Sequence, residues 1–121
     1  MVAKVKSMGI RVLVVEDEPI IALDIRRQLA HAGFEVLGPA TSLASALSFI
    51  TEPGCDVAVL NVNLGNETSE PIARKLRASG KPFVVLSGCS RDDLPPSFSG
   101  ATFLTKPCPM AELVAAVRKC I

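Results

Sequence analysis

Four short apolar runs of this sequence each lead into polar residues that could do chemistry. The carboxylates of Glu16 and Asp17 follow the first run, and the amide of Asn61 follows the second. The hydroxyl of Ser87 follows the third run, and the ammonium of Lys106 comes just after the fourth. Carboxylates that gather a hard divalent cation, beside a hydroxyl and an ammonium, suit phosphoryl transfer. The residue types therefore indicate phosphoryl chemistry, although the central position holds an amide where a carboxylate is expected.

The apolar runs read as buried strands whose ends must bring these side chains together. They cover residues 12–15, 57–60, 83–86 and 102–104. Helix-like periodicity lies between them, and alternating strand and helix patterns predict βα units in a parallel sheet. Open parallel sheets bind their ligands in a crevice at the carboxyl ends of the strands. We therefore predict an α/β fold in which all five polar residues lie around one crevice.

Turn and cap residues place the other elements. Pro19 suits the first turn of a helix, and Gly33 suits the position just after its end. A short strand is expected over residues 34–37, stopped by Gly38-Pro39, and a polar loop over residues 65–68. The last helix is expected to bury one face, made by Met110, Leu113, Val114, Val117 and Ile121.

The segment over residues 91–100 is irregular where a fourth helix should lie. Adjacent prolines, Pro95 and Pro96, prevent more than about one turn of regular helix through that point. We therefore predict a degenerate fourth helix.

The composition limits the function. The chain has 121 residues, of which 49% are hydrophobic, and a formal net charge of +1, with no Trp or Tyr. This length suits one domain over residues 1–121, with 1–8 as a disordered or extended N-terminal segment and no output domain. A nucleic-acid binder would carry a basic stripe and stacking aromatics, so we expect none bound. No run approaches the ~20 apolar residues that span a bilayer, so we expect a cytoplasmic protein without membrane contact.

The four cysteines show no metal-ligand spacing. Cys55, Cys89, Cys108 and Cys120 are widely separated, and Cys89 and Cys108 flank the predicted crevice. Small buried or half-buried thiols in a reducing compartment are the expected state.

Together these features resemble the receiver domain of bacterial two-component response regulators over nearly the whole chain. The resemblance implies a flavodoxin-like, doubly wound sheet of five parallel strands in the order 2-1-3-4-5. It implies a magnesium site made by Glu16, Asp17, the side chain at position 61 and the backbone carbonyl of Asn63. It also places Asn61 at the phosphoacceptor position, which an aspartate occupies in the family.

The same resemblance implies roles for the remaining polar residues. Ser87 would be the switch hydroxyl, Lys106 would contact the transferred group, and Phe103 would be the switch aromatic. A cis peptide at Lys106-Pro107 is compatible with this pattern. The implied partners are a histidine kinase, a phosphotransfer protein or another signalling protein, and a homodimer is compatible with the sequence. The implied activity is signalling through protein contacts, not enzymatic turnover.

Asn61 changes what the site can do. The nitrogen lone pair of an amide is delocalised and its oxygen is neutral, so we expect no phosphotransfer to Asn61. Loss of one anionic ligand predicts weakened or absent Mg²⁺ binding. Without a third carboxylate, Lys106 is expected to pair with Asp17. Asp56 lies five residues earlier on the same strand, roughly 16 Å away at 3.3 Å per residue, so it cannot replace the missing carboxylate.

Three function classes stay open. The first is a receiver-like module that binds partners without being switched by phosphorylation. The second is a normal phosphoaspartate receiver whose acceptor aspartate has been replaced by Asn61, since the rest of the site is nearly complete. The third is a small phosphatase using Asp17, or a cofactor-binding protein on the same fold. A phosphate-binding cofactor suits the acidic residues 16–18 poorly, and the chain lacks a capping insertion for a phosphatase.

Overall fold

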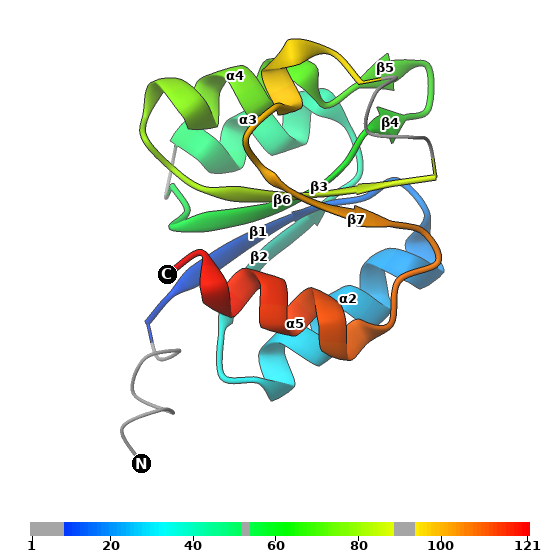
Figure 1. Ribbon diagram of the computed structural model, residues 1–121, viewed down its shortest axis with the longest axis vertical. Coiled ribbons are helices and arrows are strands. Elements are labelled where there is room, and N and C mark those ends of the chain that lie inside the picture. Colours follow the sequence, from blue (N-terminus) through cyan, green and yellow to red (C-terminus); the bar gives the residue numbers. More distant parts are fainter. Residues whose placement is uncertain (1–8, 52–53, 89–93) are drawn as a thin grey trace.

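The computed structural model describes residues 9–51, 54–88 and 94–121. Its main sheet has five parallel strands in the order β2-β1-β3-β6-β7 (Figure 1). The strands are β1 (Arg11–Val15), β2 (Glu35–Ala40), β3 (Val57–Asn61), β6 (Phe83–Ser87) and β7 (Thr102–Thr105). Numbered along the chain within this sheet, the order is 2-1-3-4-5. The predicted doubly wound α/β fold is therefore confirmed.

Helices cover both faces of the sheet. Figure 1 shows α2 (Pro19–His31) and α5 (Met110–Lys119) on one face, with α3 (Leu43–Thr51) and α4 (Glu70–Ala78) on the other. Alternate residues of β1 serve the two layers, because side chains along a strand point to opposite faces. Val12 and Val14 pack with α2 and α5, whereas Leu13 and Val15 pack with α3 and α4. Burial on both faces explains why the strands read as unbroken apolar runs.

The ends of α2 follow their sequence signals. Pro19 is the first helical residue, where its missing N–H costs nothing. Gly33, with φ of 98°, follows the C-cap, and the amide of Phe34 donates to the carbonyl of Leu29 at 3.1 Å. The predicted bounds of this helix are confirmed. At the other end of the chain α5 stops at Lys119, so Ile121 lies beyond it and is 46% exposed, contrary to the prediction that it belongs to the buried face.

The second strand does not stop at Gly38-Pro39, as the sequence had indicated, but continues to Ala40. It lies at the edge of the sheet and its pairing with β1 contains a register shift at this point. A proline is tolerated on an edge strand, because no ladder hydrogen bond is lost there. Gly38, with φ of 92°, makes the close approach to the backbone that the shift requires.

The predicted polar loop over residues 65–68 is instead part of a small antiparallel hairpin. It consists of β4 (Asn63–Leu64) and β5 (Glu67–Thr68), which are joined through Gly65 and Asn66. Gly65 has a φ of 62°, which a two-residue hairpin turn needs. The chain after β3 therefore folds back beside the end of that strand.

In place of a regular fourth helix, the described part of the segment before β7 holds a 3₁₀ turn, η2 (Pro96–Phe98). Residues 91–93 of this segment lie outside the described ranges. Phe98 is buried, and the hydroxyl of Ser97 donates to a carboxylate oxygen of Glu70 in α4 at 2.7 Å. The prediction of no more than a turn of helix is confirmed for the residues described.

Among the described residues, none lies in a helix with both the length and the apolar character to cross a membrane.

Candidate functional site

The ends of four strands bring the candidate residues to one edge of the sheet. Val15, the last residue of β1, pairs with Leu60, so Glu16 lies level with Asn61 at the end of β3. Ser87 ends β6 and pairs with Thr105, the residue before Lys106. The structure therefore gathers the two carboxylates, the amide, the hydroxyl and the lysine at the same edge.

Glu16 and Lys106 form a buried ion pair at this edge. The ammonium Nζ of Lys106 lies 3.2 Å from Oε1 of Glu16, whose side chain is 1% exposed. The amide of Glu18 donates to the other carboxylate oxygen of Glu16 at 3.2 Å. The expectation that Lys106 pairs with Asp17 was therefore wrong. Glu16 is the carboxylate withdrawn from water and needs a counter-charge most, whereas Asp17 takes its hydrogen bonds elsewhere.

Burial raises the pKa of Glu16 above 4.5. The hydrogen bond from Glu18 and the positive charge of Lys106 oppose this rise without cancelling it. Lys106 thus partly compensates the cost of a carboxylate held out of water.

The Asn61 amide lies between two oxygen acceptors. Its Nδ2 is 2.7 Å from the backbone carbonyl oxygen of Asn63 and 3.3 Å from Oδ1 of Asp17. Both neighbours can only accept, so the amide must present its nitrogen to them, with one N–H for each. The other oxygen of Asp17 accepts from the amide of Gly65 at 2.9 Å. The side chain of Asn61, 8% exposed, thereby ties the end of β1 to the β4–β5 hairpin.

Asp17 responds to its environment in the opposite sense to Glu16. Burial alone would raise its pKa, but the hydrogen bonds that it accepts from the backbone of Gly65 and from Asn61 contribute to a net pKa below 3.8. Asp17 is therefore the carboxylate of this pair that stays charged most readily.

Gly65 is the site residue that the sequence analysis missed. Its amide contacts Asp17 because the hairpin turns the chain back towards the end of β1. The Gly65-Asn66 dipeptide lies between residues 63–64 and 67–68, which can pair as short strands. Such a dipeptide between pairing residues is typical of a two-residue hairpin turn. That pattern could have identified the turn, although not its contact with Asp17.

Ser87 lies at the crevice, at the end of β6, whereas Phe103 lies in the neighbouring strand β7. Ser87 is 2% exposed, and its backbone carbonyl accepts from the amide of Lys106 at 2.9 Å. Phe103 is half-buried in the middle of β7 and packs against the core cluster under α3 and α4. The peptide bond Lys106-Pro107 is cis, as the sequence had suggested.

The oxygens that could hold magnesium face an N–H group of the protein itself. The carbonyl of Asn63 and one oxygen of Asp17 point to the Asn61 nitrogen, and Glu16 is paired with Lys106. Over the described ranges, no group of three or more His, Cys, Asp or Glu is arranged to hold a metal ion. As arranged, these residues do not fit a divalent cation, which requires oxygen lone pairs directed at it.

Asp56 lies at the opposite edge of the sheet from Asn61. Its Oδ2 accepts from the backbone amide of Arg11, the first residue of β1, at 2.7 Å. The expectation that Asp56 is remote from the crevice is confirmed. Of the cysteines, Cys55, Cys108 and Cys120 are free thiols, and Cys89 lies outside the described residues.

Comparison with known proteins agrees with this geometry. The sequence model of the response regulator receiver domain family matches residues 12–118. Response regulator MprA of Mycobacterium tuberculosis is 29% identical over 116 residues, which are 92% of this chain and 50% of that protein. The chain thus spans about half the length of the curated relatives that it matches.

Solved structures show the same fold. The solution structure of SdrG from Sphingomonas melonis Fr1 is 37% identical, with a TM-score of 0.74, and the match covers 89% of this chain and 95% of that one. The response regulator TrrA from Thermotoga maritima, solved in complex with Mg(2+)-BeF, is 24% identical, with a TM-score of 0.78 and coverage of 93% and 99%.

Proposed function

The chain belongs to the response regulator receiver domain family of two-component signalling, and we propose that it acts by binding partner proteins without being switched by phosphorylation at Asn61. Receiver domains interact with histidine kinases and phosphotransfer proteins, and these are the partner classes that we propose here. A homodimer is a further assembly compatible with the proposal. Because the chain spans half of the curated relatives, these partners are proposed for the domain and not for a longer protein.

The position of the Asn61 amide nitrogen is the observation that carries the proposal. The N–H groups of Asn61 reach the carboxylate of Asp17 and the carbonyl of Asn63, the two groups that magnesium would bring together in a receiver. The partial positive charge on these hydrogens attracts both oxygens and holds them close together, as a bound cation would. The residues of the crevice are then held in place without a metal ion, and the surrounding surface has its final shape before any ligand binds.

Chemistry gives the same answer at position 61. A phosphoryl group is transferred to a nucleophile with an available lone pair. The amide oxygen lacks the negative charge of a carboxylate oxygen, and the lone pair of the amide nitrogen is delocalised. Asp56 lies at the far edge of the sheet and is held by Arg11. We therefore propose that Asn61 accepts no phosphoryl group and that Asp56 does not replace it.

Magnesium binding is proposed to be weak or absent. A bound cation would need oxygen lone pairs from Asp17, Asn61 and Asn63, so the Asn61 amide would have to turn and give up its two hydrogen bonds. Only one carboxylate, Asp17, would then be free to offset the cost of dehydrating the ion, because Glu16 is paired with Lys106.

A second candidate is supported by the completeness of the remaining site. The acidic pair of Glu16 and Asp17, the hydroxyl of Ser87 and the ammonium of Lys106 are all present at the crevice, and these are the residue types that a working receiver would need. These features favour a normal phosphoaspartate receiver whose acceptor has been replaced by asparagine. Restoring the carboxylate separates the two candidates, because only this second one has a phosphorylated state that partners recognise.

The test is a binding comparison between the native chain and Asn61→Asp. Purified histidine kinases and phosphotransfer proteins of the organism that encodes the chain are each assayed, with and without magnesium and a small phosphodonor. For a constitutive module we expect the native chain to bind a partner with the same affinity in all conditions. Binding that appears only with the phosphorylated Asn61→Asp variant would contradict the proposal and support the replaced acceptor.

A further inference from the structure

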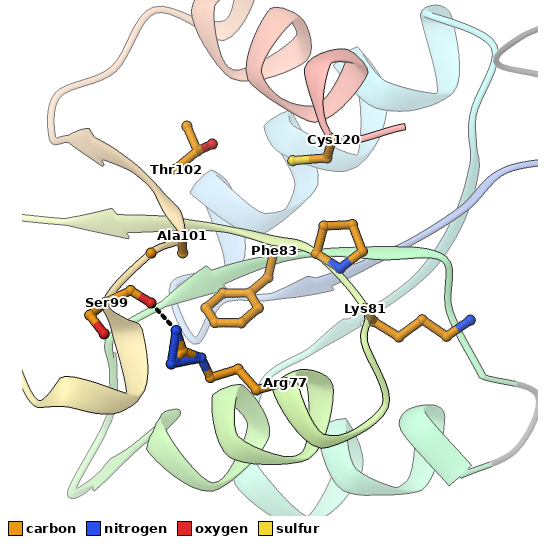
Figure 2. A pocket seen from close by; sticks show the side chains of 9 residues that line it. Arg77, Lys81, Phe83, Ser99, Ala101, Thr102 and Cys120 are labelled. Carbon is orange, nitrogen blue, oxygen red and sulfur yellow. Dashed lines mark hydrogen bonds between the residues drawn. The ribbon is translucent and has the colours of Figure 1, made fainter.

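A second hollow lies at the other edge of the sheet, away from the crevice. It has a volume of about 220 Å³ and is bordered by the end of α4, the starts of β6 and β7, and the chain after α5 (Figure 2). Phe83 and Thr102 are the first residues of their strands, whereas Ser87 and Thr105, at the crevice, are the last. Four steps along a strand separate the two edges by roughly 13 Å. The hollow and the crevice therefore do not overlap.

The lining of this hollow is positively charged. Arg77 and Lys81 border it, and its lining residues, all of which are described, include no carboxylate. Within the described ranges, the ion pairs join Arg11 to Asp56, Arg74 to Glu70, and Lys106 to Glu16, so none engages Arg77 or Lys81. Arg77 thus faces a small hollow (Figure 2) whose lining carries no carboxylate, and Lys81 lies at its border without an ion-pair partner in the described residues.

Arg77 is held in place across the hollow. Its guanidinium donates to the backbone carbonyl of Ser99, in the turn before β7 (Figure 2). Gly100 makes room for it, since a Cβ at this position would lie 3.1 Å from the same guanidinium nitrogen. One hydrogen bond leaves several of the five N–H donors of an arginine available. The side chain is therefore positioned before any ligand arrives.

The other walls are neutral. Phe83 and Pro82 form an apolar side, while the hydroxyl of Thr102 and the thiol of Cys120 lie across from Arg77 (Figure 2). The side chain of Lys81 starts at the border of the hollow and extends away from Arg77 (Figure 2), so it adds positive potential but does not contact the same point as the guanidinium. The hollow is smaller than the roughly 300–1,000 Å³ of pockets for drug-sized ligands.

We propose that this hollow binds a small oxyanion, a carboxylate or a phosphate, through the guanidinium of Arg77, with Lys81 adding attraction at the rim. The fork of an arginine matches two oxygens of either group. The apolar side suits a short hydrocarbon part, as in a small organic acid. This site serves a ligand, not the phosphoryl chemistry of the crevice, and does not depend on Asn61.

The test is a ¹H–¹⁵N NMR titration with acetate, succinate and inorganic phosphate at constant low ionic strength, with chloride as the reference. We expect saturable shifts at the amide of Gly100 and at Nε of Arg77. The amide of Gly65, at the crevice, should stay unchanged. The three ligands distinguish a preference for a monocarboxylate, a dicarboxylate or a phosphate.

Variants assign the binding to the hollow. Arg77→Gln should weaken binding roughly tenfold or more, because a hydrogen bond to a charged group is lost. Lys81→Gln, which leaves the contact with Ser99 intact, should weaken it by roughly two- to fivefold. Arg74→Gln removes a positive charge from the same helix outside the hollow and should leave the affinity unchanged.

Three results would overturn the proposal. These are shifts that do not saturate, an affinity that survives Arg77→Gln, and an equal loss in Arg74→Gln, which would indicate non-specific charge. If Arg77→Gln loses the dispersion of a folded protein, Lys81→Gln decides, and an unchanged affinity there counts against the site.

Discussion

At the scale of single residues, the difference between an amide and a carboxylate at position 61 reorganises the site. The nitrogen of Asn61 donates where an aspartate could only accept. An aspartate in the same place would face the negatively charged carboxylate of Asp17 and the partly negative carbonyl oxygen of Asn63, and both would repel it. A cation is then needed where the native chain needs none.

We therefore predict that Asn61→Asp lowers stability when magnesium is chelated. Two hydrogen bonds are lost, one of them to a charged group, so the free energy of unfolding should fall by about 1–3 kcal/mol in EDTA. Added magnesium should restore much of this loss by binding the folded variant. Thermal unfolding with EDTA or magnesium measures both effects.

Asn66→Asp is the matched control for that experiment. It adds the same charge in the neighbouring β4–β5 hairpin, at an exposed residue with no part in the contacts of Asp17. It should shift the melting temperature little in either buffer. Equal melting temperatures of Asn61→Asp and the native chain in EDTA would refute the proposed role of the amide.

Lys106→Met is expected to destabilise the fold. It removes the counter-charge of Glu16 while keeping most of the side-chain length, which leaves a buried carboxylate without its cation. Breaking a buried pair costs about 3–5 kcal/mol, and the partial exposure of Lys106 reduces this to about 2–4 kcal/mol. Chemical denaturation at neutral pH measures the loss. Lys75→Met, at an exposed position of α4, should cost no more than about 1 kcal/mol, and a similar cost at both positions would contradict a special role of Lys106.

The pKa of Glu16 predicts the sign of a pH effect. Its folded pKa is raised above 4.5, so between these two values the folded protein holds a proton that the unfolded chain has released. This contribution to the free energy of unfolding is therefore lost as the pH rises from 4.5 through the folded pKa. The difference in unfolding free energy, native minus Glu16→Gln, should fall with rising pH over that window. Urea unfolding at a series of pH values measures this difference, and a constant or rising difference would count against a raised pKa of Glu16.

At the scale of elements, the sequence predicted what depends on repeated local patterns. The five strands and the bounds of α2 follow from apolar runs and from Pro19 and Gly33. The continuation of β2 past Gly38 depends on pairing with β1, which residues 35–40 alone do not encode. The same holds at the site. The strand ends predicted that Glu16 and Lys106 lie close together, but which carboxylate pairs with the lysine depends on burial, a property of the folded chain.

Gly38 shows how strongly pairing constrains an element. A Cβ there would lie 2.6 Å from the amide nitrogen of Ala40 and 3.0 Å from the carbonyl oxygen of Val14, and backbone atoms cannot move aside cheaply. Gly38→Ala should therefore cost well over the about 1–2 kcal/mol of a left-handed alanine alone. Gly80→Ala, with φ of 70° and open space around it, should cost only that amount. Equal losses in chemical denaturation would mean that the close backbone contacts with Ala40 and Val14 are not the cause.

At the scale of the whole molecule, the sheet separates two sites with different chemistry. The carboxyl ends of the strands hold the closed network of Asn61, and the amino ends of β6 and β7 border the positively charged hollow at Arg77. The segment around η2 is fastened to α4 by contacts of Ser97 and Ser99. The chain belongs to the response regulator receiver domain family, and at the acceptor position of that family the side chain of Asn61 links the end of β1 to the β4–β5 hairpin.

The most direct test of the central claim is intact-mass spectrometry after incubation with magnesium and a small phosphodonor. The native chain should gain no phosphoryl group, because an amide occupies the acceptor position. The Asn61→Asp variant, with Ser87 and Lys106 still in place, should gain one. A stoichiometric phosphoryl adduct on the native chain, mapped by fragmentation to the crevice, would contradict the account.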